Sequence, residues 1–134
     1  MKYKFIEDLT SDVMFEAYGK DLKELFENAA LALSDVICKN VKPKLKVSVK
    51  VKGDDLKELM INWLQEIISS VDIKDMFFSK FDIKMINEKK LEANIYGEEI
   101  TPEKGETVVK AVTNYNFKLE KNKKRYLVRI SLDI

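Results

Sequence analysis

Histidine is absent from this chain of 134 residues, and cysteine occurs once, at Cys38. The absence of histidine excludes a Ser-His-Asp triad, a Cys-His dyad, an imidazole general base and any histidine-ligated metal site on this chain. A single cysteine permits neither an intrachain disulfide nor a cysteine-based zinc site. Any chemistry must therefore use carboxylates, amines, hydroxyls and the backbone.

Glycine and proline are also scarce, with four and two residues, and there is no long apolar run. The sequence thus offers no linker or domain boundary, and we expect one domain over residues 1–134. No stretch has the length of a signal-peptide core or a membrane span, which predicts a cytoplasmic protein without a membrane partner. Neither GxxxxGK[ST] nor GxGxxG occurs, so we expect no nucleotide site on this chain alone.

Charge of one sign is not in excess, because 24 Lys and Arg residues face 23 Asp and Glu residues and leave a formal net charge of +1. This balance gives no global reason to expect nucleic acid as the main partner. The basic run Lys121–Arg125 is either a hairpin tip or a contact to RNA phosphate. The run contains no aromatic residue on which a base could stack, and this favours the hairpin.

Two segments have helical hydrophobic periodicity, one from about Lys20 to Cys38 and one from about Asp54 to Val71. Asp54 or Asp55 is the expected N-cap of the second helix. The opening residues 1–5 are strand-like, and the remaining segments alternate with period two, so strands are also expected near residues 13–18, 44–51, 77–85, 91–95, 108–119 and 126–132. This order predicts an α+β domain in which two amphipathic helices pack on one face of a mixed, largely antiparallel β-sheet.

The last expected strand ends in Leu132, Asp133 and Ile134. Because Leu132 continues the apolar face, we expect Asp133 on the opposite face, beside the α-carboxylate of Ile134. If a third carboxylate came from elsewhere, such oxygen ligands would suit Ca²⁺, Mg²⁺ or Mn²⁺. The alternative is a polar strand end in water.

Asp12 and Lys110 are two other candidate functional residues, and each also has a purely structural interpretation. Asp12 follows Thr10 and Ser11, and this combination is also typical of a turn or a cap. Lys110 lies among apolar residues of an expected strand, where a lysine is also typical of a solvated face or a protected edge. Cys38 and Trp63 fit buried core positions.

Taken in order, several segments resemble the archease family. They are Thr10-Ser11-Asp12-Val13, Ala17-Tyr18-Gly19, Ala29-Ala30-Leu31-Ala32-Leu33, Trp63-Leu64-Gln65-Glu66, Phe78-Ser79-Lys80-Phe81, Tyr96-Gly97-Glu98, Val109-Lys110-Ala111-Val112-Thr113 and Leu132-Asp133-Ile134. The similarity covers nearly the whole chain. No single segment is specific, but Lys-Ala-Val-Thr on a strand together with a terminal Leu-Asp-Ile is distinctive.

The resemblance implies a small α+β protein that activates an RtcB-type RNA ligase in tRNA splicing. Such a protein promotes GTP-dependent guanylylation and multiple turnover of the ligase, meets tRNA only through the ligase and is not itself the catalyst. A divalent metal site at Asp12, Asp133 and Ile134 is implied, with Ca²⁺ in isolation or Mn²⁺ or Mg²⁺ in the functional complex. Lys110 matches the family's strand lysine and is a candidate contact to phosphate or to the ligase.

The family commonly has a histidine immediately before the position of Thr10 or two residues before it, whereas here Leu9 precedes Thr10. In addition, Ser11 takes the place of an alanine that is usual in the family. These departures remove any imidazole ligand but keep the three carboxylates. Two other functions fit the composition. One is a general protein-binding chaperone or assembly module without metal chemistry. The other is a small metal-dependent hydrolase, whose base would have to be a carboxylate such as Glu98.

Overall fold

The computed structural model describes residues 1–7 and 12–134. Its helices and strands are β1 (Tyr3–Ile6), β2 (Val13–Gly19), α1 (Leu22–Ile37), β3 (Leu45–Lys52), α2 (Leu56–Lys74), β4 (Met76–Ile86), β5 (Lys90–Glu99), a 3-10 turn η1 (Pro102–Lys104), β6 (Ala111–Lys121) and β7 (Tyr126–Asp133). The predicted order of helices and strands is confirmed. Across the described ranges, neither helix is long and apolar enough to cross a membrane.

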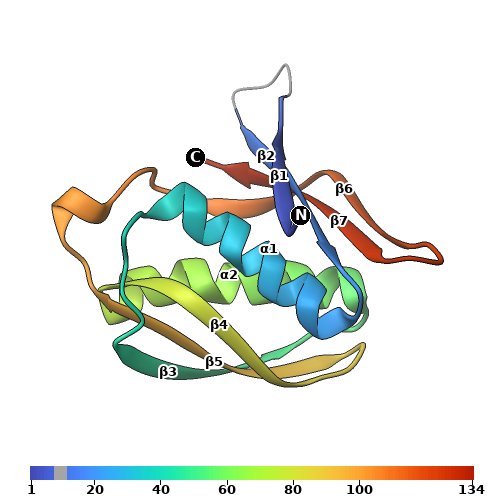
Figure 1. Cartoon of the computed structure of the whole chain (residues 1–134), viewed down its shortest axis with the longest axis horizontal. Coiled ribbons are helices and arrows are strands. Elements are labelled where there is room, and N and C mark those ends of the chain that lie inside the picture. The colour runs from blue at the N-terminus through green and yellow to red at the C-terminus, as the bar shows by residue number, and fades with distance from the viewer. Residues whose placement is uncertain (8–11) are drawn as a thin grey trace.

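The strands form two antiparallel sheets, and the two helices lie between them (Figure 1). One sheet has the order β1-β2-β7-β6 and the other has the order β3-β5-β4. Helix α1 packs against β2 of the first sheet and β4 of the second, while α2 packs against β6 of the first and against β3 and β4 of the second. The core is therefore a single layer of helices that is covered on both sides.

The α+β class is confirmed, but the single mixed sheet with helices on one face is not what forms. Every pairing of neighbouring strands is antiparallel. Helix α1 buries more than its one predicted stripe, since Ala30 and Ala32 are fully buried beside Leu33. Small side chains allow a second sheet to approach the helix closely. Alternation of period two identifies strands, but it does not say which strands pair.

Both helices begin with the same local pattern, an aspartate followed three residues later by a glutamate. The backbone N–H of Glu58 donates to Oδ1 of Asp55 at 2.8 Å, so Asp55 is the N-cap of α2. Asp21 caps α1 through the N–H of Glu24 at the same distance. These side chains satisfy backbone donors that have no partner inside the helix, and this stabilises each helix start.

Buried hydrogen bonds connect the layers. The indole N–H of Trp63 on α2 donates to the carbonyl oxygen of Phe26 on α1 at 2.9 Å. The side-chain amide of Asn28 donates to the carbonyl oxygen of Tyr18 on β2 at 2.7 Å. Because Trp63 is fully buried and satisfied, its predicted place in the core is confirmed, and the two bonds hold α1 to both α2 and the four-stranded sheet.

Candidate functional site

The candidate site lies where β7 ends, between the beginnings of β2 and β6. Val13 of β2 pairs with Leu132 of β7, and Ala111 of β6 pairs with Asp133. Asp12 lies in a bend directly before Val13, and Lys110 directly precedes Ala111. The structure thus brings together segments that are about one hundred residues apart in the sequence.

Asp133 lies on the outer face of this strand end. Leu132 is fully buried, and Asp133, the next residue, is half-buried. Alternation along β7 directs the Asp133 side chain away from the core.

Lys110 holds the backbone of this strand end. Its N–H donates to the carbonyl oxygen of Asp133 at 2.7 Å, while its side chain is exposed. The predicted strand from 108 begins three residues too early, because β6 starts at Ala111. Lys110 is therefore the residue just before β6 rather than an interior strand position. Ile134 is 39% exposed.

Ser131 is a residue of this face that sequence reasoning missed. It is fully buried, and within the described part of the chain its Oγ has no hydrogen-bond partner. It lies opposite Met14 of β2 and Thr113 of β6, two residues before Asp133 and hence on the same face. An unpartnered buried hydroxyl beside carboxylates is consistent with a polar ligand or a bound water at this face. Nothing in the sequence marks this serine as buried.

The sequence predicts carboxylate ligands for a divalent cation at this strand end. Within residues 1–7 and 12–134, no cluster of three or more Asp, Glu, His or Cys side chains has the geometry to hold a metal ion. The ligand set of Asp12, Asp133 and the α-carboxylate of Ile134 stays a prediction. Oxygen ligands of this kind suit Ca²⁺, Mg²⁺ or Mn²⁺, whose remaining positions water can fill. Thr10 and Ser11 lie outside the described residues.

A buried ion pair fixes the pairing of β2 with β7 on the same face. The carboxylate of Glu16 is only 10% exposed, and its Oε2 accepts from Nη2 of Arg129 at 3.0 Å and from Nε at 3.3 Å. Tyr18 donates to the other oxygen at 3.1 Å. Burial by itself raises the pKa of Glu16, but the bonds from Arg129 and Tyr18 and the nearby positive charge outweigh it, so the pKa is lowered.

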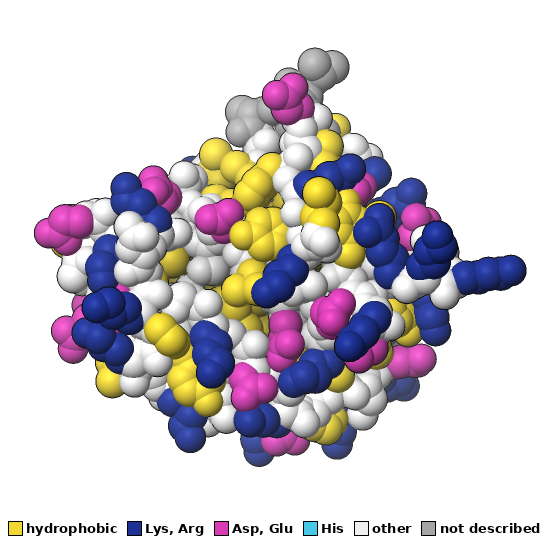
Figure 2. All heavy atoms as spheres, viewed as in Figure 1, with side chains coloured by type: hydrophobic (Ala, Val, Ile, Leu, Met, Phe, Trp, Pro, Cys, Tyr) yellow, Lys and Arg dark blue, Asp and Glu magenta, His cyan; other side chains and the backbone are white. Residues whose placement is uncertain are grey.

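The basic run is a hairpin turn, as predicted. The side-chain oxygen of Asn122 accepts from the N–H groups of Lys124 and Arg125 at 2.8 and 2.9 Å. Basic side chains gather at this tip, on the far right of Figure 2. Strand β7 has eight residues and begins here, so the tip and Asp133 are about 23 Å apart along it. The basic tip and the candidate metal site are therefore separate surfaces.

Glu98 does not belong to this site. It lies on β5 in the three-stranded sheet, whereas Asp12 and Asp133 are in or beside the four-stranded sheet. The ammonium group of Lys104 lies 2.6 Å from Glu98, and the backbone N–H of Lys42 donates to it at 2.7 Å. These bonds lower the pKa of Glu98. A carboxylate held in this way is a poor general base at neutral pH.

Comparison with known proteins identifies relatives along nearly the whole chain. Residues 3–134 match the archease protein family. Protein archease of Sulfurisphaera tokodaii is 39% identical over 139 residues, with 99% of each chain covered. Protein archease of Pyrococcus abyssi is 40% identical over 119 residues, with 84% of each chain covered.

Solved structures share the fold. The solution structure of Methanobacterium thermoautotrophicum protein 1598 matches with a TM-score of 0.84 and 33% identity, and 98% of each chain is covered. The crystal structure of a Thermotoga maritima archease, described as a possible chaperone, matches with a TM-score of 0.70. Its identity is 16%, with 96% of this chain and 95% of that chain covered, so this likeness concerns the fold alone.

Proposed function

The chain belongs to the archease protein family, and from this membership we propose that it is a protein cofactor that activates an RtcB-type RNA ligase in tRNA splicing. It promotes GTP-dependent guanylylation of the ligase and allows multiple turnover. The ligase, and not this chain, is the catalyst. The chain reaches tRNA only through the ligase, acts in the cytoplasm and has no nucleotide site of its own.

The observation that carries the proposal is the register of β2, β7 and β6. It places the start of β2 next to Leu132 and the start of β6 next to Asp133, which supports a shared site for Asp12, Asp133 and Ile134. Carboxylate oxygens are the ligands that hard divalent ions prefer, and the ion binds as Ca²⁺ in isolation or as Mn²⁺ or Mg²⁺ in the complex.

Different residues of this chain have different roles at the ligase surface. Asp12, Asp133 and Ile134 hold the ion at an exposed strand end, where a partner can approach it. When bound, the ion supplies Lewis-acid and templating chemistry for nucleotidyl transfer. The exposed ammonium group of Lys110 contacts phosphate or the ligase and stabilises negative charge there. The backbone bond from Lys110 to Asp133 keeps these groups together.

A ligation time course tests this function. An RtcB-type ligase from the same source is kept well below its RNA substrate, with GTP and Mn²⁺, and the wild-type chain is compared with Asp133→Asn. The substitution keeps the size of the side chain and removes its charge. We expect many turnovers with the wild type and about one with the variant. Asp54→Asn is the matched control, since Asp54 is an exposed aspartate just before α2.

Metal binding is measured in parallel by calorimetric titration of the isolated chain with Ca²⁺ and Mn²⁺. We expect Asp133→Asn to weaken binding and Asp54→Asn to leave it unchanged. Full activation by Asp133→Asn, with its metal affinity lost, would refute the carboxylate mechanism. No acceleration by the wild type would refute the ligase role itself.

A general chaperone or assembly module without metal chemistry is the second candidate. It is favoured by exposed aliphatic side chains, above all Val108, which is 82% exposed, and Ile73, which is 77% exposed. Protection of a client protein from aggregation, unchanged by Asp133→Asn, would support this candidate.

A further inference from the structure

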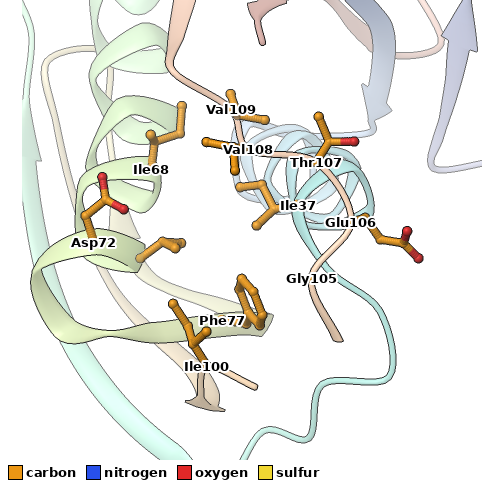
Figure 3. A pocket seen from close by; sticks show the side chains of 11 residues that line it. Ile37, Ile68, Asp72, Phe77, Ile100, Gly105, Glu106, Thr107, Val108 and Val109 are labelled. Atoms are coloured by element: carbon orange, nitrogen blue, oxygen red, sulfur yellow. The ribbon is translucent and has the colours of Figure 1, made fainter. Parts of the chain in front are cut away.

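An apolar groove lies at the end of the molecule where both helices stop (Figure 3). Its volume is about 280 Å³. Ile37 at the end of α1 and Ile68 near the end of α2 form two of its walls, and Phe77 of β4 lies at its base. Residues 105–109, which lead from η1 towards β6, close the remaining side. Apolar walls of this size can receive one or two aliphatic side chains.

Val108 is the most unusual residue of the groove. Its neighbour Val109 is buried, but Val108 is 82% exposed although it lines the groove. The backbone of this segment is fixed, because the N–H groups of residues 106 and 107 donate to the carbonyl oxygens of Ile37 and Val36 at 2.9 and 3.1 Å. A valine held open to water beside an apolar hollow offers surface that a partner can bury.

The charge at the groove is negative. Asp72 lies on its rim in the last turns of α2 (Figure 3). Among the residues that the structure describes, no lysine or arginine forms an ion pair with Asp72, whereas the other acidic lining residue, Glu106, is paired with Lys39 at 3.4 Å. The carbonyl end of α2 adds partial negative charge on the same side. A positively charged group of a partner would complement Asp72 on this rim.

The groove is continuous with the candidate metal site. Val108 is two residues from Lys110, whose backbone N–H donates to the carbonyl oxygen of Asp133. The segment that forms one wall of the groove therefore ends at the carboxylates. In Figure 1 this segment runs from η1 past the end of α1 to the start of β6, close to the C-terminus. A partner bound in the groove would lie beside the carboxylate site.

We propose that the groove binds a segment of the ligase that presents an aliphatic side chain next to a lysine or arginine. The aliphatic side chain enters between the ends of α1 and α2 and covers Val108, and the cation pairs with Asp72. This inference rests on the proposed function. It assigns the groove to docking and the carboxylates to activation, so the two surfaces have different effects when they are changed.

Binding of the ligase by the full chain tests the inference, measured by calorimetry. Val108→Ser and Asp72→Lys change the groove. Leu45→Ser, at a residue 48% exposed on β3, and Asp54→Lys are matched controls elsewhere. We expect each groove variant to raise the Kd by about tenfold, as loss of a central contact does, and each control to stay within about twofold. At saturating concentration, the groove variants should restore full turnover, because their carboxylates are intact.

Crosslinking identifies the bound segment. Cys38 is buried, so a Val108→Cys variant has one accessible thiol for a benzophenone maleimide, and Leu45→Cys is the control. We expect Val108→Cys to label one ligase peptide that contains an aliphatic residue beside Lys or Arg. Labelling of a peptide without a cation, or equal labelling from Leu45→Cys, would overturn the inference.

Failure of the inference and failure of the proposed function give different results. If wild-type chain activates the ligase while Val108→Ser and Asp72→Lys bind it as tightly as wild type, the groove is not the docking site and the function stands. If wild-type chain neither binds nor activates the ligase, the function fails and the inference fails with it.

Discussion

Ser131→Ala should make the protein more stable while it weakens metal binding. The Ser131 hydroxyl is fully buried and has no partner within the described part of the chain. A buried hydroxyl without a hydrogen bond costs about 1–3 kcal/mol. Removing one oxygen also loses packing contacts and leaves a small void, which costs less than about 1 kcal/mol. We therefore expect the free energy of unfolding to rise by about 1 kcal/mol.

The measurement is equilibrium unfolding in guanidinium chloride with a chelator present, followed by the fluorescence of Trp63. This single tryptophan is fully buried, so it reports loss of the core. Ser34→Ala is the matched control, since its hydroxyl donates to the carbonyl oxygen of Phe78 at 2.6 Å. That variant should lose about 1 kcal/mol, the typical value of one intramolecular hydrogen bond. Replacing serine by alanine should therefore raise the free energy of unfolding at position 131 and lower it at position 34.

Calcium titration completes the experiment. A hydroxyl next to Asp133 that bonds a ligand or its bound water should strengthen metal binding, and loss of such a supporting group weakens affinity by about tenfold or more. If Ser131→Ala destabilises the protein as much as Ser34→Ala does, the hydroxyl is satisfied and the reasoning is refuted. Unchanged calcium affinity would show that Ser131 has no part in the site.

Two other changes test how the sheets are held. Arg129→Met removes the partner of the buried Glu16 carboxylate and should lower the free energy of unfolding at pH 7 by about 1.5–3 kcal/mol. Because the pKa of Glu16 is lowered in the fold, this stabilisation is present above its unfolded pKa and is lost as pH falls through the folded pKa. Unfolding curves of the two proteins should thus converge in acid, and a constant difference would contradict the assignment. Gly97→Ala puts a Cβ 1.7 Å from the carbonyl oxygen of Phe77, so β4 must shift and the cost should exceed about 2 kcal/mol. In Gly105→Ala the nearest atom is 3.4 Å away, and similar unfolding midpoints for both alanine variants would contradict this reading.

Local structure was readable from the sequence because it depends on nearby residues. The 3.6-residue period located both helices, and the Asp-x-x-Glu pattern at Asp55 corresponds to a real cap. Alternation predicted most strands, and the turn at Asn122 formed as expected. The start of β6 was placed too early because Val108 and Val109 continue the pattern of period two, although their segment bonds to the end of α1.

The pairing of strands depended on tertiary structure. Seven amphipathic strands can form one sheet or two, and the sequence pattern is the same in both cases. Two sheets form because α1 is buried on more than one side, as Ala30 and Ala32 show. The sequence did not indicate that Arg129 is a hydrogen-bond partner of Glu16. The two residues are 113 positions apart in the chain, and they come into contact only when β2 pairs with β7.

The sequence by itself determined which groups are available to this protein: carboxylates and amines, no imidazole, and an aspartate on the polar side of a terminal strand. It also carried the family resemblance, and with it the choice of Asp12, Asp133, Ile134 and Lys110. Only the tertiary structure decided that the starts of β2 and β6 flank the end of β7 and that a groove with an exposed Val108 lies just before β6. The physical reason is that composition and periodicity are local properties, whereas a site requires contacts that form only when distant strands pair.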